Sequence, residues 1–231
     1  AFYEDKHNFP VHFVGHPLID EISARTPVVP ENFRKEHHLD DRPIIALLPG
    51  SRKQEIQKML EIMLSITTDF PEYQFVIAGA PSQDLEFYGP FLKKNRVHIV
   101  MNQTYNLLDV AHAALVTSGT ATLETALFKV PEVVCYKGGR ISYEIAKRVI
   151  NLDYISLVNL IMDKEVVKEL IQTEFNTKTL KKALTEILEE EKRKALFDEY
   201  YKLEQKLGGV GASANTAKLI VNAIKSTSTP V

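Results

Sequence analysis

Two short segments of the sequence combine small residues, hydroxyl groups and charge in a way that suits binding of a phosphate group. In the first, Pro49-Gly50 predicts a turn after an apolar run, and Ser51 is expected to cap the helix that follows. Arg52 would place a permanent guanidinium beside the free N–H groups of that helix start. The segment therefore predicts a cradle for a diphosphate, and the alternative is a capped helix with a surface arginine.

The second segment follows another apolar run further along the chain. Ser118, Gly119 and Thr120 would present hydroxyls and closely approachable backbone to an anion. Glu124 lies one helical turn later, where its carboxylate could accept hydrogen bonds from ribose hydroxyls. The alternative role for Glu124 is the acidic member of a capping box. That role fits less well, because Ala121 would have to be the N-cap.

Several other chemistries lack their sequence motifs. No G-x-G-x-x-G follows a predicted strand, and neither the P-loop lysine pattern, H-E-x-x-H nor G-x-S-x-G occurs. The histidines lack metal-site spacing, so we predict no metal site. The near balance of 28 Lys plus Arg against 30 Asp plus Glu argues against a general nucleic-acid binder.

The elements that would position these segments alternate between short apolar runs and amphipathic stretches. Buried strands of a parallel sheet are predicted over residues 44–48, 75–78, 97–101, 114–117 and 133–136. Helices are expected between them, for example around 56–66 and 107–111. This alternation predicts an α/β fold with a Rossmann-like, doubly wound parallel sheet. Both segments would then follow strand ends, where such sheets bind ligands.

The last third of the sequence differs in character. From Lys164 onward the pattern is helical and charged, and the run 189–194 predicts a solvated helix face. Gly208-Gly209-Val210-Gly211 is expected to break the helix ahead of a final helix over 212–225. We therefore divide the chain into a leading segment (1–41), a Rossmann-like domain (42–207), and a hinge with a C-terminal helix (208–231).

The composition suits a globular protein from a reducing compartment. Of the 231 residues 45% are hydrophobic, and Cys135, the single cysteine, is predicted to be a core residue. No run approaches the roughly 18 apolar residues of a membrane span, and no secretion signal opens the sequence. We expect a cytoplasmic protein. The sequence starts at Ala1 in a stretch typical of the middle of a longer protein, so we also expect a fragment.

The two segments, in this order, resemble the L-P-G-S-R and T-S-G-T-A-x-L-E motifs of the lipid-A-disaccharide synthase family. Further blocks resemble the family over residues 13–18, 145–148, 153–160 and 168–172, so that the resemblance runs from about Val11 to about Ile224. It implies the C-terminal, nucleotide-sugar-binding domain of a GT-B glycosyltransferase. The implied reaction transfers 2,3-diacylglucosamine from its UDP conjugate to 2,3-diacylglucosamine 1-phosphate. It releases UDP, inverts the anomeric centre and uses no cofactor.

The resemblance also implies roles for individual residues. Arg52 and the Ser118–Thr120 turn would bind the diphosphate and stabilise the departing UDP, and Glu124 would hold the ribose. The general base and the acceptor site would belong to the family's N-terminal half. We therefore expect this chain alone to bind UDP or the donor at best weakly and not to turn over.

Three later residues are less clearly assigned. Asn159 and Gln172 lie in blocks that match the family and would complete the donor pocket, or would instead satisfy buried backbone groups. Arg148 is either a further phosphate ligand or a member of a structural salt bridge.

Two alternatives stay open at the level of the sequence. One is another UDP-sugar enzyme with the GT-B fold, such as a peptidoglycan glycosyltransferase or a UDP-sugar epimerase. A G-G-S loop would favour the former, and this chain has Pro49-Gly50-Ser51. The other is a non-catalytic nucleotide-binding or dimerisation module, whose final helix would dock on another domain or exchange between subunits of a homodimer. Acylated substrates imply peripheral contact with the inner face of the membrane, although no basic amphipathic surface helix is obvious here.

Overall fold

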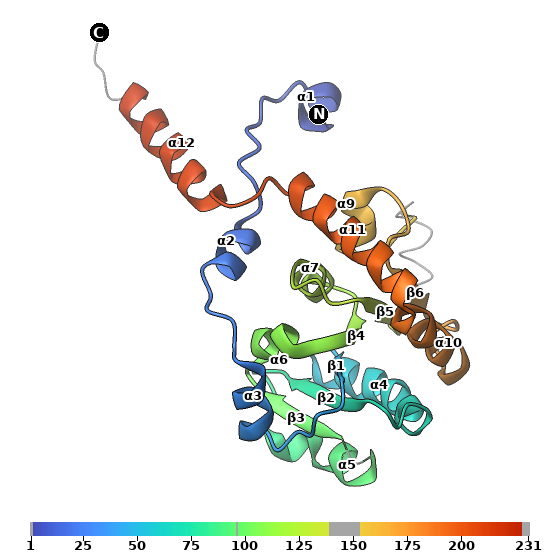
Figure 1. Cartoon of the computed structure of the whole chain (residues 1–231). Coiled ribbons are helices and arrows are strands. Elements are labelled where there is room, and N and C mark those ends of the chain that lie inside the picture. The colour runs from blue at the N-terminus through green and yellow to red at the C-terminus, as the bar shows by residue number, and fades with distance from the viewer. Residues whose placement is uncertain (1, 96, 139–152, 228–231) are drawn as a thin grey trace. The chain divides into compact units, whose positions relative to one another are not determined.

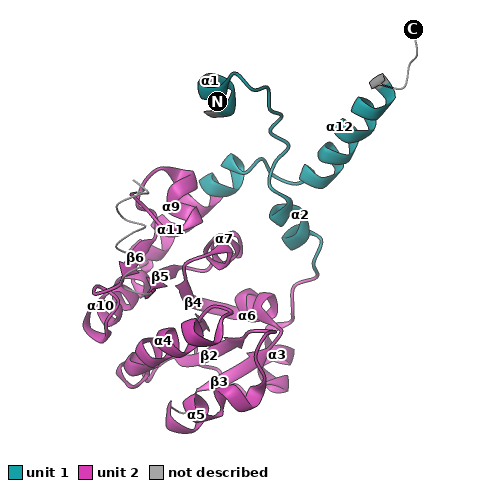
Figure 2. Cartoon of the chain, turned by 180° about the vertical axis from the view of Figure 1, so that it is seen from behind, with its two compact units in different colours: residues 1–25, 202–231 teal, residues 26–201 magenta. Residues whose placement is uncertain are grey.

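The structure of the protein is a computed structural model that describes residues 2–95, 97–138 and 153–227. The chain forms two compact units. The larger one comprises Thr26–Tyr201, and the smaller one combines Ala1–Arg25 with Lys202–Val231 (Figure 2).

The larger unit is built on one parallel sheet of six strands, whose order is β3-β2-β1-β4-β5-β6. The strands are β1 (Ile44–Leu48), β2 (Gln74–Gly79), β3 (His98–Met101), β4 (Ala111–Thr117), β5 (Glu132–Tyr136) and β6 (Lys168–Ile171). The five strands predicted from the apolar runs are all present. The doubly wound α/β prediction is thereby confirmed.

Helices cover both faces of this sheet (Figure 1), which is why its central strand β1 is apolar and buried along its whole length. On one face, α3 (Pro30–Glu36) and α6 (Thr104–Val110) contribute Phe33, Leu107 and Leu108 to a core cluster with Ile44 and Ala46 of β1. On the other, α4 (Lys53–Met63), the 3₁₀ helix η1 (Leu64–Asp69) and α10 (Thr177–Leu188) contact one another. The other helices that the structure describes in this unit are α5 (Leu85–Asn95), α7 (Thr120–Leu127), α9 (Leu157–Met162) and most of α11 (Glu190–Lys206).

Strand β6 corrects the prediction that the chain is helical from Lys164 onward. The segment carries two charged residues in four, which hides the strand from a search for apolar runs. Glu169 and Leu170 are nevertheless buried, while Lys168 is exposed. The pairing of Cys135 with Leu170 places β6 beside β5 at the edge of the sheet.

The start of α4 also differs from the prediction. The helix begins at Lys53, and Arg52 is its N-cap, with an extended backbone (φ −93°, ψ 134°) and no side-chain capping bond. Ser51 therefore lies in the turn and does not cap the helix. Its carbonyl accepts a hydrogen bond of 2.6 Å from Ser82 Oγ, which ties the turn after β1 to the loop after β2.

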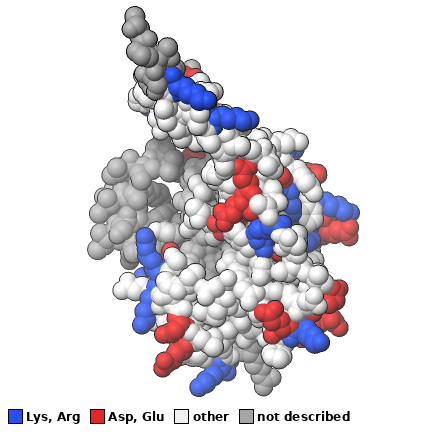
Figure 3. Space-filling view, turned by 90° about the vertical axis from the view of Figure 1, so that its left-hand side faces the viewer, with Lys and Arg blue, Asp and Glu red and all other residues white. Residues whose placement is uncertain are grey.

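The charged run after α10 lies mostly on the surface, as predicted, because α11 begins at Glu190 and turns most of these side chains to solvent. Arg193 is the exception: it is half-buried and donates a hydrogen bond of 2.7 Å to the carbonyl of His112. Acidic and basic side chains are interspersed over the face shown in Figure 3. That face carries no continuous field of one sign.

The smaller unit contains α1 (Phe2–His7), α2 (Pro17–Ser23) and α12 (Ala212–Thr227), and α12 confirms the predicted final helix. Asp20 of α2 accepts hydrogen bonds from the backbone N–H groups of Gly211 (2.6 Å) and Ser213 (2.7 Å). These bonds join segments from the two ends of the chain, and they hold the pKa of Asp20 below its ordinary value.

The division of the chain at residues 41 and 207, drawn from the sequence, does not coincide with these units. It places α3 in the leading segment, whereas Phe33 of α3 belongs to the core of the sheet. Within the described residues, no helix is long and apolar enough to cross a membrane.

Candidate functional site

The two segments singled out in the sequence leave neighbouring strands at the point where the strand order reverses. Strand β1 lies next to β4, and Leu48 pairs with Val116 at their carboxyl ends. Because the strands are parallel and in register, the turn after Leu48 and the turn after Thr117 emerge side by side. In open α/β sheets such a reversal is the usual place for a ligand.

A pocket of about 260 Å³ lies between these two turns. Five residues proposed from the sequence line it, namely Ser51, Ser118, Gly119, Thr120 and Glu124. The other lining residues come from the ends of β1, β2 and β4, the loops after β1 and β2, and the starts of α4, α6 and α7. They include Gly50, Glu55, Pro81, Thr104 and Thr117. The structure thus brings both segments to one cavity, and the binding roles of these residues stay a prediction.

The start of α7 presents open backbone to the pocket. Its N-cap, Gly119, has φ 155° and ψ −162°, a combination essentially restricted to glycine, and no atom lies within 4 Å of where a Cβ would be. The first N–H groups of a helix have no partner inside the helix, and the helix dipole makes this end positive. Leu123 and Ala126 are buried and fix α7 against its neighbours. The pocket therefore offers backbone donors suited to an anion.

Ser118 does not offer the free donor groups that the sequence suggests. Its backbone N–H donates to the carbonyl of Cys135 at 3.1 Å, because the β4–β5 ladder continues one residue beyond the strand. Its hydroxyl donates to the carbonyl of Ile155 at 3.0 Å. Ser118 therefore has acceptor capacity left but no hydrogen to give.

The opposite wall of the pocket contains a carboxylate that sequence reasoning missed. Gly50 has φ +99°, and a Cβ added to it would overlap the carboxylate of Glu55. Glu55 lies in the first turn of α4, so its side chain reaches back over the turn. The capping-box spacing of three counts from Arg52, so the expected cap at Ser51 hid this role of Glu55 in the sequence. Glu55 and Glu124 give the pocket two acidic side chains.

Arg52 stands beside this pocket without lining it. Its side chain is exposed, and it makes no hydrogen bond or ion pair among the residues that the structure describes. Since it directly follows Ser51, which does line the pocket, the guanidinium is attached at the rim.

Asn159 is committed to the fold, so we do not retain it as a pocket residue. Its Nδ2 donates to the carbonyl of Val167 (2.9 Å) and to Glu169 (2.8 Å). Its Oδ1 accepts from the N–H groups of Val166 (2.8 Å) and Val167 (2.9 Å). Of the two roles weighed from the sequence, the satisfaction of buried backbone is the one that these bonds fill.

Gln172 follows β6 and does not line the pocket. Its backbone is left-handed (φ 54°), and its N–H donates to the carbonyl of Tyr136 at 2.8 Å. Its buried Nε2 has no partner in the described part of the chain. Arg148 lies outside the described residues.

Thr117, the last residue of β4, was not singled out in the sequence. It is only 3% exposed and lines the pocket, and its Oγ1 is buried without a hydrogen-bond partner in the described part of the chain. A polar residue that closes a buried strand at its carboxyl end was the signal available, since ligands bind at this end of the sheet.

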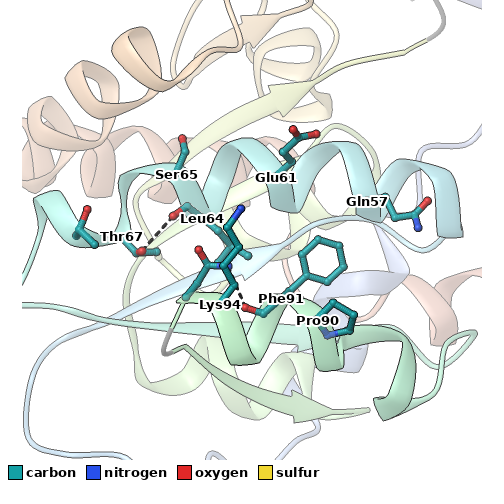
Figure 4. A pocket seen from close by; sticks show the side chains of 10 residues that line it. Gln57, Glu61, Leu64, Ser65, Thr67, Pro90, Phe91 and Lys94 are labelled. Atoms are coloured by element: carbon teal, nitrogen blue, oxygen red, sulfur yellow. Dashed lines mark hydrogen bonds between the residues drawn. The ribbon is translucent and has the colours of Figure 1, made fainter.

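A larger pocket of about 830 Å³ lies elsewhere, between α5 and the outer side of α4 and η1. Figure 4 shows Phe91 and Lys94 extending from α5 toward α4, which contributes Gln57 and Glu61. None of the residues proposed from the sequence lines this second pocket. Among the described residues, no group of three or more His, Cys, Asp or Glu is placed to hold a metal ion.

Comparison with known proteins gives one consistent family. The model of the family described as lipid-A-disaccharide synthetase matches residues 1–223. A lipid-A-disaccharide synthase of Coxiella burnetii (strain CbuG_Q212) is 37% identical over 226 residues, which cover 95% of this chain and 59% of that protein. One from Syntrophus aciditrophicus (strain SB) is 37% identical over 223 residues, covering 93% and 58%. The chain spans less than two thirds of the length of these relatives.

Two solved structures share the fold. A UDP-N-acetylglucosamine 2-epimerase from Listeria monocytogenes has a TM-score of 0.59 and 14% identity, covering 94% of this chain and 54% of that chain. The C-terminal domain of a glycosyl transferase group 1 family protein from Francisella tularensis has a TM-score of 0.53 and 13% identity, covering 82% and 98%. At such identities the likeness speaks for the fold alone.

Proposed function

Because this chain belongs to the lipid-A-disaccharide synthetase family, we propose that it carries the nucleotide-sugar-binding part of a glycosyltransferase of lipid A biosynthesis. The reaction transfers 2,3-diacylglucosamine from its UDP conjugate to the 6-hydroxyl of 2,3-diacylglucosamine 1-phosphate and releases UDP. The two acylated sugars are the expected partners, and the chemistry requires no cofactor or metal.

The pocket between the turns after β1 and β4 is the proposed donor site. The single observation that carries this proposal is the register of β1 against β4. Because Leu48 pairs with Val116, the turns after the two strands lie side by side and line one cavity. The diphosphate would lie against Gly119 and Thr120 at the positive end of α7. The Glu124 carboxylate would accept hydrogen bonds from the ribose hydroxyls.

Arg52 would complete the site from its rim. Its long exposed side chain has the reach and freedom to close over a bound diphosphate, and a guanidinium can make two parallel hydrogen bonds to phosphate oxygens. The donor bond breaks as negative charge gathers on the departing UDP. A fixed cation and fixed helix amides at that place stabilise the transition state more than the ground state. The general base and the acceptor site are proposed to lie outside these 231 residues.

The test of the donor site is titration with UDP, followed by isothermal calorimetry. We expect the chain to bind UDP and Arg52→Ala to weaken binding by about tenfold or more, since charge-assisted hydrogen bonds contribute roughly 1.5–3 kcal/mol. Lys58→Ala is the matched control, because Lys58 is an exposed cation of the same helix and does not line the pocket. Equal losses of UDP affinity in the two variants would mean that Arg52 acts only through the overall charge of the protein. UDP binding that Arg52→Ala leaves unchanged would remove Arg52 from the site.

The alternatives are not favoured by any specific contact. The likeness to an epimerase is confined to the fold, whereas the family match covers nearly the whole chain. Peripheral contact with the membrane would follow from the acylated substrates, and a homodimer would be formed through the smaller unit. The membrane contact is tested by binding to lipid vesicles. The homodimer is tested by a measurement of molar mass in solution.

A further inference from the structure

The hydroxyl of Thr117 is placed as a ligand-binding group would be. Thr117 closes β4 between the two turns of the pocket, and its Cα pairs with that of Cys135 in the sheet. The residue is 3% exposed, yet it lines the pocket, and its Oγ1 has no partner among the described residues. The residue therefore borders a cavity, while its hydroxyl is withdrawn from bulk water.

Two nearby threonines show what a buried hydroxyl normally does in this fold. Thr122 and Thr125 of α7 are fully buried. Their hydroxyls donate to the carbonyls of Gly119 (2.9 Å) and Ala121 (2.8 Å) in the preceding turn of the helix. Thr117 lies in a strand, and its hydroxyl reaches no carbonyl of the described residues. A buried hydroxyl that stays unpaired destabilises the folded protein, so native structures leave few of them.

Glu55 and Glu124 line the pocket as well, so the case for an anionic partner of Thr117 rests on the backbone at the start of α7. Gly119, Thr120 and Ala121 line the same pocket at the positive end of α7. Of the two hydroxyl residues to which the sequence assigned this role, Ser118 donates to Ile155 and Thr120 is exposed. Thr117 is thus the one residue of this turn whose buried hydroxyl still has its hydrogen to give, within the described part of the chain.

We propose that the Thr117 hydroxyl donates a hydrogen bond to a phosphate oxygen of the bound nucleotide. This inference rests on the proposed function and deepens it, because it replaces Ser118 by Thr117 as the hydroxyl donor of the site. The unpaired hydroxyl then destabilises the free protein, and binding of the nucleotide removes this destabilisation.

The proposal predicts opposite effects of one substitution on two quantities. Thr117→Val keeps the branched shape and removes the hydroxyl. We expect it to weaken UDP binding by about tenfold, the scale of a hydrogen bond to a charged group. In the absence of ligand, the melting temperature should stay equal or rise, because the unpaired hydroxyl is gone. Thr117→Ser keeps the hydroxyl and should bind UDP within about threefold of the wild type.

Thr125→Val is the matched control, because it removes a hydroxyl that has a protein partner. It should lower the melting temperature and leave UDP affinity within about twofold. Melting is followed by circular dichroism and affinity by calorimetry. If Thr117→Val folds poorly, Thr117→Ala compared with Thr117→Ser gives the same contrast.

Two results would overturn the inference while leaving the proposed function intact. One is wild-type UDP affinity in Thr117→Val. The other is a loss of thermal stability in Thr117→Val as large as that in Thr125→Val, which would mean that the hydroxyl is already satisfied, for instance by water. If the wild-type chain fails to bind UDP, the proposed function fails, and the Thr117 contact fails with it.

Discussion

Glu132 is a second buried polar residue whose surroundings set a measurable property. It opens β5, is fully buried, and neither of its carboxylate oxygens has a partner in the described residues. Burial, and to a lesser degree the charge of Glu169, raise the pKa of this carboxyl well above its ordinary value of 4.5. Glu132 is therefore protonated in the folded protein under conditions in which an exposed glutamate is ionised.

This raised pKa predicts how stability depends on pH. Since the folded state holds its proton more tightly than the unfolded state does, the contribution of Glu132 is most favourable below pH 4.5. It declines as the pH rises toward the folded-state pKa. Glu132→Gln removes the ionisable group. Between pH 4.5 and pH 8, urea unfolding should show the free energy of unfolding of the variant rising relative to that of the wild type. The difference should be about 1.4 kcal/mol for each unit by which the folded-state pKa is raised.

Glu191→Gln is the control for this effect, because Glu191 is exposed on α11. It should change stability little over the same pH range. A difference between wild type and Glu132→Gln that is the same at pH 4.5 and pH 8 would contradict the prediction.

Individual residues of the site were predictable where the residue type alone decides which groups are available to a ligand. Gly119, Thr120 and Glu124 could be proposed because small residues and a carboxylate follow a strand end. The bond of Ser118 to Ile155, the four bonds of Asn159 and the unpaired Thr117 depend on segments that come together only in the folded sheet. The local sequence places Thr117 at the end of a strand and Ser118 in the turn, but it does not tell which of the two hydroxyls has a partner.

Among the elements, the turn between β1 and α4 depends most on a single residue. Gly50 has φ +99°, a conformation that side chains rarely adopt, so Gly50→Ala should destabilise the protein by about 1–3 kcal/mol. The variant should also lose UDP affinity, because the turn carries Ser51 and Arg52. Urea unfolding and calorimetry measure the two effects.

Glu55→Ala separates the two causes of strain at this turn. It removes the carboxylate that a Cβ at Gly50 would overlap but leaves the backbone conformation unchanged. By itself it should unfold close to the wild type, and in Gly50→Ala/Glu55→Ala most of the loss should remain. Full recovery in the double variant would show that the side-chain overlap, and not the backbone, is the cause.

Helices and strands were predictable where burial requires a continuous run of apolar residues. Five strands contain an apolar run that could be read directly, whereas β6 carries Lys168 and Glu169 among its four residues. The start of α4 was placed too early because Ser51 has a side chain suited to capping. In the structure its carbonyl is held by Ser82, which belongs to a different loop.

At the scale of the whole molecule, we expect these 231 residues to bind nucleotide without catalysing the transfer. The chain spans 59% of the length of its Coxiella burnetii relative. We predict that the purified 231 residues bind UDP but release none from the UDP-activated donor when the acylated acceptor is supplied. UDP release is followed by a coupled assay, with a full-length relative as the positive control. Release above the enzyme-free rate that Arg52→Ala abolishes would overturn this prediction.

The placement of β4 beside β1 has a consequence for how the protein acquires its pocket. Strands β2 and β3 follow β1 in the chain but lie on its other side, so β4 must skip past both of them to reach its place. Pairings between distant segments form slowly during folding, because a long loop must close before any contact rewards it. In a refolding experiment, the capacity to bind nucleotide should therefore emerge with the slowest sheet-forming phase, after most helical signal has already returned.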